Sequence, residues 1–197
     1  MLRVMLASRS PRRIELLRGA GLEIVARPAP CDETAHPGEP PLDYVRRIAR
    51  AKLDAGRRGA SPTERDGEWL AADTIVWSDT AEGPRMFGKP RDRDEARETL
   101  RHLCATPHHV TTGWALDGPA GFELHTETTR VWMRRVTTTE LERYLDDEAA
   151  WRDKAGGYGI QAAAAGWVTT LHGSYTNVVG LPLAQVLVRL HARQTPP

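Results

Sequence analysis

Cysteine is scarce in this 197-residue chain, and long hydrophobic runs are missing. Its two cysteines, Cys31 and Cys104, lie far apart and form no Cys-x-x-Cys pair. This spacing argues against a disulfide framework and a cysteine-based zinc site, and it fits a reducing cytoplasm. The apolar run at the N-terminus is short and contains Arg3, so we expect neither a signal peptide nor a membrane-spanning segment. We therefore expect a cytoplasmic protein.

Charge of one sign and several familiar nucleotide motifs are lacking as well. The net charge is +1, which gives no electrostatic case for stable nucleic-acid or membrane binding. Without a GxGxxG, Walker A or GxSxG pattern, a Rossmann dehydrogenase, a P-loop NTPase or an α/β-hydrolase is disfavoured. His108 and His109 are adjacent, so on a strand they face opposite sides and cannot bind one metal together.

Strand-like and helix-like segments alternate through most of the chain, which predicts an α/β protein with a largely shared central sheet. Strands are expected at 2–7, 69–77, 110–116, 122–133 and 167–171. Helices are expected to begin after Ser10, at Leu42, after Asp92, after Thr137 and near Pro182. The polar stretch 56–67 is expected to be a mobile surface connection. With no internal repeat, residues 1–197 are expected to form one domain.

The segment from Ser8 to Arg13 places positive charge where a helix disfavours it. Ser10 is the expected N-cap and Pro11 the first helical residue, which puts Arg12 and Arg13 in the first turn. The helix dipole disfavours each arginine there by a few tenths to about 1 kcal/mol. A bound anion would offset this cost, since backbone amides, serine hydroxyls and guanidinium groups together can bind phosphate. The alternative is that both arginines extend into solvent.

Lys52 and Asp73 each interrupt an apolar pattern. Lys52 lies near the centre of the apolar stripe of the helix that begins at Leu42, so its ammonium either reaches past the edge to solvent or ends in a polar cavity. Asp73 interrupts the apolar run 70–77, where a buried carboxylate needs a partner or a shifted pKa. Asp73 is a candidate functional residue because strand ends in open α/β sheets bind ligands; the alternative is that it caps a local turn.

Two glycine-bearing segments supply further polar groups. Lys89 lies between Gly88 and Pro90, in a rigid loop directly before a helix. The stretch 153–161 holds three glycines within four residues, and Lys154 and Gln161 add a charge and a two-way hydrogen-bonding amide. The alternative interpretation of this stretch is a simple flexible turn.

Taken together, these segments resemble the Maf family of nucleotide pyrophosphatases. The matching motifs follow the family order and span nearly the whole chain: 6–13, Asp32-Glu33, the Lys52 helix, 72–74, 88–92, 109–113, 153–161 and 173–183. The resemblance implies a Maf/ITPase-like α/β fold, with a mixed central sheet flanked by helices and two lobes around a deep substrate cleft. It is also compatible with a homodimer.

The resemblance further implies hydrolysis of a nucleoside triphosphate to the monophosphate and pyrophosphate, with Mg, Mn or Co as divalent cofactor. In this interpretation Asp73 is the general base, and Glu33 and Asp73 are candidate metal ligands. The candidate phosphate-binding residues are Ser8, Ser10, Arg13, Lys52, Lys89 and Lys154. The alternative is a nucleotide-binding regulator of cell division and septation without significant turnover.

The residues at three family-specific positions, Arg12, Thr74 and Gln161, resemble those of the subfamily that acts on dTTP and UTP. A glutamine amide can both donate and accept, as the O4 and N3–H edge of thymine or uracil requires. Ala162 and Trp132 depart from the family pattern, which usually has glycine and phenylalanine there. These departures leave open whether modified pyrimidine triphosphates are the preferred substrates.

Overall fold

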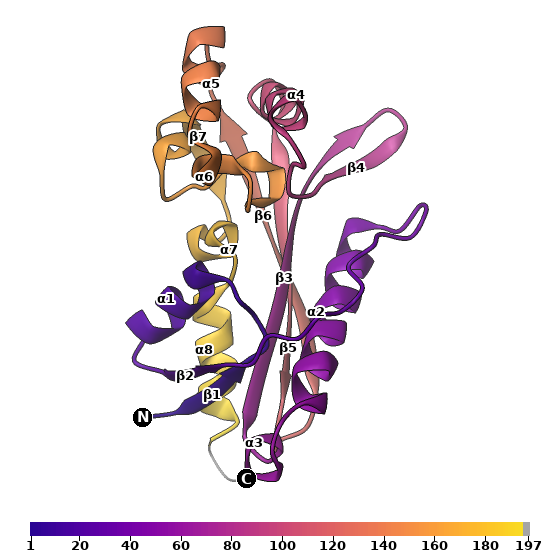
Figure 1. Ribbon diagram of the computed structural model, residues 1–197, viewed down its shortest axis with the longest axis vertical. Coiled ribbons are helices and arrows are strands. Elements are labelled where there is room, and N and C mark those ends of the chain that lie inside the picture. Colours follow the sequence, from indigo (N-terminus) through magenta and orange to yellow (C-terminus); the bar gives the residue numbers. More distant parts are fainter. Residues whose placement is uncertain (195–197) are drawn as a thin grey trace. The chain divides into compact units, whose positions relative to one another are not determined.

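The computed structural model describes residues 1–194 and divides the chain into two compact units. Unit 1 holds residues 1–73, 112–127 and the described residues from 180 onward, and unit 2 holds 74–111 and 128–179. The strands form a seven-stranded sheet in the order β2-β1-β3-β5-β6-β7, with β4 paired to β3. Strand β1 is parallel to β2 and β3, whereas β3–β4 and β6–β7 are antiparallel. The predicted α/β class, with a mixed sheet flanked by helices, is confirmed (Figure 1).

The sheet contains β1 (Arg3–Leu6), β2 (Glu23–Ala26), β3 (Glu68–Thr80), β4 (Gly83–Phe87), β5 (His108–Asp117), β6 (Glu123–Met133) and β7 (Val168–His172). The helices are α1 (Pro11–Gly19), α2 (Pro41–Arg58), α3 (Pro62–Arg65), α4 (Arg93–Leu103), α5 (Thr138–Leu145), α6 (Glu148–Trp151), α7 (Tyr175–Val179) and α8 (Leu183–Ala192). Two 3₁₀ turns lie at Ala155–Gly157 and Ala163–Trp167. Within the described part of the chain, no helix has both the length and the apolar character needed to cross a membrane.

The polar connection expected at 56–67 is more ordered than its composition suggested. Helix α2 continues to Arg58, and the short helix α3 follows. Ser61 and Glu64 form a reciprocal capping box around the start of α3, which satisfies amides that would otherwise lack partners. Strand β4 and helices α6 and α7 were not predicted either, because segments of four or five residues are too short to show a clear periodicity.

In unit 1, the alternation of side chains along β3 decides which face of the sheet each residue reaches. Leu70 and Ala72 pack in a core with residues of α1 and α8, whereas Trp69 and Ala71 pack in a second core with residues of α2. Since successive strand residues point to opposite faces, Asp73 shares the face that α2 covers. The strand thereby aims the Asp73 carboxylate at α2.

Helix α2 lies unusually close to strand β5. A Cβ atom added at Gly113 of β5 would come within 3.0 Å of backbone atoms of Val45 and Arg46 on α2. Real Cβ atoms do not tolerate such distances from a backbone, so only glycine fits here. Backbone therefore packs against backbone, and this contact fixes the height of α2 above the sheet.

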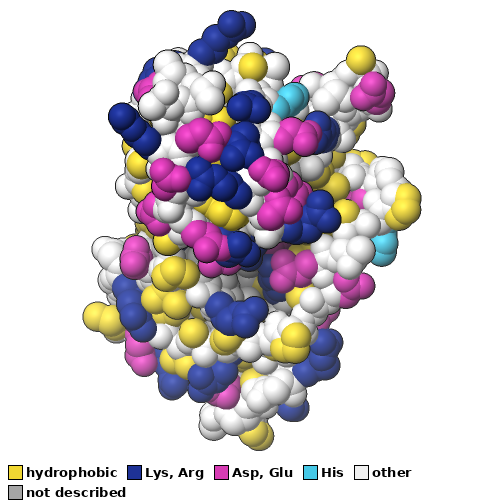
Figure 2. Space-filling model, turned by 45° about the horizontal axis from the view of Figure 1, so that its top comes forward, with side chains coloured by type: hydrophobic (Ala, Val, Ile, Leu, Met, Phe, Trp, Pro, Cys, Tyr) yellow, Lys and Arg dark blue, Asp and Glu magenta, His cyan; other side chains and the backbone are white. Residues whose placement is uncertain are grey.

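Unit 2 has its own core, built around helices α4 and α5. Leu100 and Leu103 of α4 and Leu141 and Leu145 of α5 are buried in one apolar cluster. Ion pairs join these two helices at the surface, with Arg93 and Arg97 of α4 bound to Glu142 of α5. Figure 2 shows positive and negative side chains intermixed on the face in view, in keeping with the small net charge.

Candidate functional site

Three charged side chains of unit 1 converge above strand β3. The Lys52 Nζ donates to Oδ1 of Asp73 at 2.7 Å and to Oε2 of Glu33 at 2.8 Å. Asp73 is buried at 7% exposure, so the ammonium is the partner that a carboxylate in an apolar strand requires. Strand β1 pairs with β3 only as far as Leu70, so Asp73 lies just beyond the end of β1, and the interpretation as a local turn cap is wrong.

Lys52 turns inward from α2 rather than reaching past the edge of the helix to solvent. Its neighbours Ile48, Ala49 and Leu53 are fully buried, while the Lys52 side chain keeps 16% exposure. The apolar stripe packs the stem against the sheet, and the ammonium ends between two carboxylates. Of the two outcomes expected for Lys52, the structure therefore shows the polar one.

The acid-rich loop before α2 is held by side chains that the sequence pattern did not single out. The Tyr44 hydroxyl donates to the main-chain oxygen of Glu33 at 3.0 Å, and an Arg47 guanidinium N–H donates to that of Thr34 at 3.0 Å. Arg47 also binds both carboxylate oxygens of Glu39 at 2.6 Å. Their positions in the first two turns of α2, next to an acidic loop, are the only sequence signal that could have found them. Together they fix the backbone from which the Glu33 carboxylate projects.

Arg13 is buried at 8% exposure, so it does not extend into solvent. Its guanidinium donates to the carbonyl oxygens of Gly180 and Ala72, both at 2.8 Å, and to the Ser8 hydroxyl at 3.2 Å. The Ser8 hydroxyl also accepts from the backbone N–H of Ser10 at 3.2 Å. Neutral oxygens thus accept hydrogen bonds from this buried arginine in the first turn of the helix, where an anion was the expected partner.

The predicted start of α1 is confirmed: Ser10 is the N-cap and Pro11 the first helical residue, although the Ser10 side chain makes no capping hydrogen bond. Arg12 is half-buried, in contrast to Arg13. Phosphate binding by Ser8, Ser10 and Arg13 stays a prediction. The contacts of Arg13 connect it to Ala72, the residue directly before Asp73, and so tie the turn to the strand that carries the carboxylate.

Electrostatics around this cluster affects its neighbours. Burial lowers the pKa of Arg13, and the nearby Asp73 carboxylate opposes that shift. Burial, together with the charges of Asp73 and Glu33, raises the pKa of the Tyr44 phenol. Burial and the Glu33 charge likewise raise the pKa of the Cys31 thiol. Tyr44 and Cys31 therefore stay protonated at neutral pH and are poor nucleophiles here.

The two glycine-bearing segments expected to carry function meet within unit 2. The Gly156 N–H donates to the Gly88 carbonyl at 2.9 Å, which brings the 88–90 loop against the 153–161 stretch. Gly156 and Gly157 have φ of 68° and 71°, a conformation that glycine adopts without strain. Lys89 is exposed, and the ammonium of Lys154 donates to a main-chain carbonyl of α6. Gln161 is exposed, and Thr74 is half-buried on β3.

Hydrogen bonds between neutral groups hold the 153–161 stretch in place. The Tyr144 hydroxyl donates to the carbonyl oxygens of Ala150 and Gly157 at 2.7 and 3.1 Å. Nε2 of His108 and the hydroxyl of Tyr158 lie 2.8 Å apart, and burial lowers the pKa of His108 to about 4. His109 instead stacks on Trp77, so the two adjacent histidines do diverge as predicted. The stretch is therefore a fixed loop rather than a simple flexible turn.

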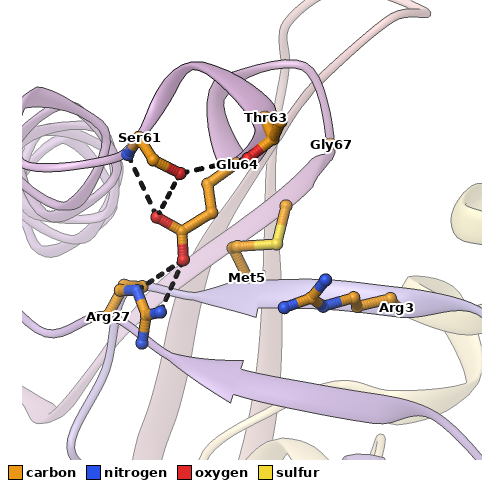
Figure 3. A pocket seen from close by; sticks show the side chains of 7 residues that line it. All are labelled: Arg3, Met5, Arg27, Ser61, Thr63, Glu64 and Gly67. Atoms are coloured by element: carbon orange, nitrogen blue, oxygen red, sulfur yellow. Dashed lines mark hydrogen bonds and ion pairs between the residues drawn. The ribbon is translucent and has the colours of Figure 1, made fainter.

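A separate pocket in unit 1, of about 440 Å³, is lined by Arg3, Met5, Arg27, Ser61, Thr63, Glu64 and Gly67. Figure 3 shows that its polar groups largely bind one another. The Arg27 guanidinium donates twice to one Glu64 oxygen, at 2.5 and 2.8 Å, and Ser61 donates to the other. The central charges of this pocket are therefore paired with each other.

The donor chemistry at Asp73 and Glu33 fits a divalent cation. One oxygen of each carboxylate already accepts from the Lys52 ammonium, and Mg²⁺ and Mn²⁺ prefer oxygen ligands. Among residues 1–194, no cluster of three or more His, Cys, Asp or Glu side chains could hold a metal. Mg²⁺ is usually bound in proteins through one or two carboxylates together with substrate phosphates and water.

A family model and several known proteins match nearly the whole chain. A family model described as "Maf-like protein" matches residues 3–193. A relative from Chelativorans sp. (strain BNC1) is 44% identical, covering 96% of this chain and 90% of its own, and one from Hahella chejuensis is 41% identical, covering 95% and 90%. Both carry the name dTTP/UTP pyrophosphatase. The solved Staphylococcus aureus Ham1 protein superposes with a TM-score of 0.47 at 12% identity, over 66% of this chain and 71% of its own. The chain belongs to the Maf family.

Proposed function

We propose that this protein hydrolyses dTTP and UTP to the nucleoside monophosphate and pyrophosphate. The observation that carries the proposal is the buried Asp73 carboxylate, bound to Lys52 and lying next to Glu33 on one face of the sheet. This cluster places a proton acceptor, a cation and a second carboxylate within a few ångströms. Relatives that are named dTTP/UTP pyrophosphatases, at 39–44% identity over most of the chain, support this choice of substrate.

In the proposed reaction, a water molecule attacks the α-phosphorus in line with the bond to the β-phosphate. Asp73 accepts a proton from this water as the new P–O bond forms, and the bond between the α-phosphorus and the bridging oxygen breaks to release pyrophosphate. A divalent metal at the Asp73 and Glu33 carboxylates would neutralise charge on the phosphate oxygens. Lys52 would add positive charge where negative charge develops.

We assign the remaining phosphate-binding roles to Ser8, Ser10, Lys89 and Lys154 on the family pattern. Arg13 has a different part in the proposal, since its acceptors include two carbonyls and a hydroxyl. It shapes the turn and the Ala72 backbone, and any phosphate contact would come in addition. The family pattern also supports base selection by Arg12, Thr74 and Gln161, with the glutamine amide pairing with both O4 and N3–H of a pyrimidine.

Pyrophosphate release tests the proposal. The purified chain is incubated with dTTP, UTP, 5-methyl-UTP, CTP, ATP and GTP, each with Mg²⁺, Mn²⁺ or Co²⁺. We expect release of pyrophosphate and monophosphate, with the highest kcat/KM for dTTP, UTP or the modified pyrimidine. Saturable binding without turnover would instead support the nucleotide-binding regulator. Release of orthophosphate would contradict attack at the α-phosphorus.

A further inference from the structure

The position of the Lys52 ammonium resembles that of a metal ion. It lies between oxygens of Glu33 and Asp73, 2.8 and 2.7 Å away, and so takes the place where a cation would meet both carboxylates. Two carboxylates and one ammonium carry a net charge of −1. A divalent cation bound between the same oxygens would be repelled strongly by an ammonium that stayed there, because partly buried charges are weakly screened.

Of the three groups, Lys52 carries its charge on the longest side chain. Asp73 is fixed in the sheet, and its side chain keeps only 10% exposure. The loop that carries Glu33 is held at its main chain by Tyr44 and Arg47. Lys52, in contrast, ends a flexible four-carbon stem and carries donors that can be redirected to other oxygens.

We propose that Lys52 holds the place of the divalent metal between Glu33 and Asp73 in the nucleotide-free protein, so that metal and nucleotide bind together. When metal and nucleotide bind, the Lys52 ammonium leaves the two carboxylates for the triphosphate, and both carboxylates would then be available to hold the cation. This inference rests on the proposed function for the identity of the nucleotide. It adds a coupling between the two ligands: free metal binds weakly, because the Lys52 ammonium already lies between the two carboxylates and the phosphate ligands are lacking.

Calorimetric titration of Mn²⁺ into the nucleotide-free protein tests the first half. Lys52→Met keeps the apolar stem and removes the ammonium, and Lys52→Gln is a polar second variant should the first fail to fold. We expect either variant to bind Mn²⁺ roughly ten- to a hundredfold more tightly than the wild type, because two carboxylates are freed for the metal. Arg46→Met is the matched control, since it removes one positive charge from an exposed position of the same helix and should leave Mn²⁺ affinity unchanged.

Two further titrations test whether the change in Mn²⁺ affinity depends on Glu33 and on the nucleotide. Adding Glu33→Gln to the Lys52 variant should abolish the gain in Mn²⁺ affinity. In the wild type, a non-hydrolysable α,β-imido analogue of dUTP should raise Mn²⁺ affinity at least about tenfold, and by less in the Lys52 variants, which lack the ammonium that moves to the phosphates.

The possible failures are distinct. Equal Mn²⁺ affinity in wild type and Lys52 variants would overturn the placeholder role, even if pyrophosphate is released normally. An equal gain in the Arg46→Met control would show a long-range charge effect and would also overturn it. Absence of pyrophosphate release from any nucleotide would overturn the proposed function, whatever the Mn²⁺ titration shows.

Discussion

The two units bury different kinds of polar group. In unit 1 the buried polar side chains include the charged residues Arg13, Glu68 and Asp73, each less than 9% exposed. In unit 2 they are neutral: the buried set consists of Ser78, Thr99, His108, Thr111, Thr129 and Asn177, and burial keeps His108 uncharged at neutral pH. The ion pairs of unit 2, such as Arg93–Glu142, lie at its surface.

The difference in buried polar groups corresponds to a difference in what those groups do in each unit. Buried charge is costly and needs close partners, so unit 1 carries it where it contributes to the proposed chemistry at Asp73, and again where Arg193 binds Glu68 at 2.9 Å. Neutral hydrogen bonds cost less to bury, and unit 2 uses them to hold the shape of the 153–161 loop. Substitutions in the two units should therefore differ in both size and kind of effect.

The largest expected effect is on turnover. Asp73→Asn keeps the size of the side chain and removes the proposed proton acceptor, so we expect kcat for pyrophosphate release to fall by about 10²- to 10⁴-fold. The melting temperature should change little, because the amide oxygen can still accept from Lys52. Asp79→Asn, at an exposed position of the same strand, is the control and should keep full activity. Near-normal activity of Asp73→Asn would refute the role of Asp73.

Arg13→Met tests whether charge buried in unit 1 supports the fold. The change leaves the Ala72 and Gly180 carbonyls without this donor, and hydrogen bonds from a charged group stabilise more than neutral ones. We expect a loss of about 3 kcal/mol in the free energy of unfolding, measured by urea denaturation with tryptophan fluorescence. Arg18→Met, exposed on the last turn of α1, should stay within about 0.5 kcal/mol of the wild type. A loss below 1 kcal/mol for Arg13→Met would show that the buried guanidinium contributes little to stability.

In unit 2, acid should favour the unfolded chain, where His108 can take up a proton that its buried site disfavours. His108 has a pKa of about 4 in the folded protein against 6.5 in the unfolded chain. Its neutral form therefore contributes stability above pH 6.5 that is lost progressively as the pH falls towards 4, because only the unfolded state takes up the proton in that range. Between pH 7 and pH 5 this loss amounts to about 2 kcal/mol.

The variant His108→Gln separates this contribution from all other titrating groups. It cannot take up a proton, but its amide can still bond to Tyr158. We expect its free energy of unfolding, measured by urea denaturation at pH 7, 6 and 5, to fall less steeply with pH than that of the wild type. Parallel pH profiles for the two proteins would contradict the assignment.

The smallest expected effect comes from one neutral hydrogen bond. Tyr158→Phe removes the hydroxyl that meets His108, and we expect a loss of about 1 kcal/mol in the free energy of unfolding by the same measurement. Tyr175→Phe, whose ring is 49% exposed, should leave stability unchanged. If Tyr158→Phe cost as much as Arg13→Met, the contrast between charged and neutral burial would disappear.

Much of the fold could be predicted from the sequence because periodicity and capping agree locally. The capping hydrogen bond from Glu95 N–H to Asp92 and the capping box of Thr137 and Glu140 mark helices α4 and α5 as expected. For Lys52, its place on the apolar stripe left two orientations open, and the contact with Asp73 decides between them. The class of the fold, and the choice of Lys52 and Asp73 as residues that interrupt an apolar pattern, were thus accessible before any coordinates.

What could not be predicted depends on contacts distant in the sequence. The partners of Arg13 include the carbonyls of Ala72 and Gly180, which lie 59 and 167 residues away, and main-chain oxygens carry no residue signal. The acceptor of the Tyr44 hydroxyl is likewise a main-chain oxygen, that of Glu33, which the residue type does not reveal. The sequence identified arginine as out of place in a first helical turn, but it could not tell an anion from a carbonyl as the group that receives it.

The close contact at Gly113 has a consequence for variation among related chains. Because nothing larger than hydrogen fits between β5 and α2, any other residue there must lift the helix and, with it, the root of the Lys52 side chain. We therefore expect a deep mutational scan selected for catalysis to rank position 113 beside the reacting residues. Gly113, which has no side chain, would then be among the positions that tolerate the fewest substitutions.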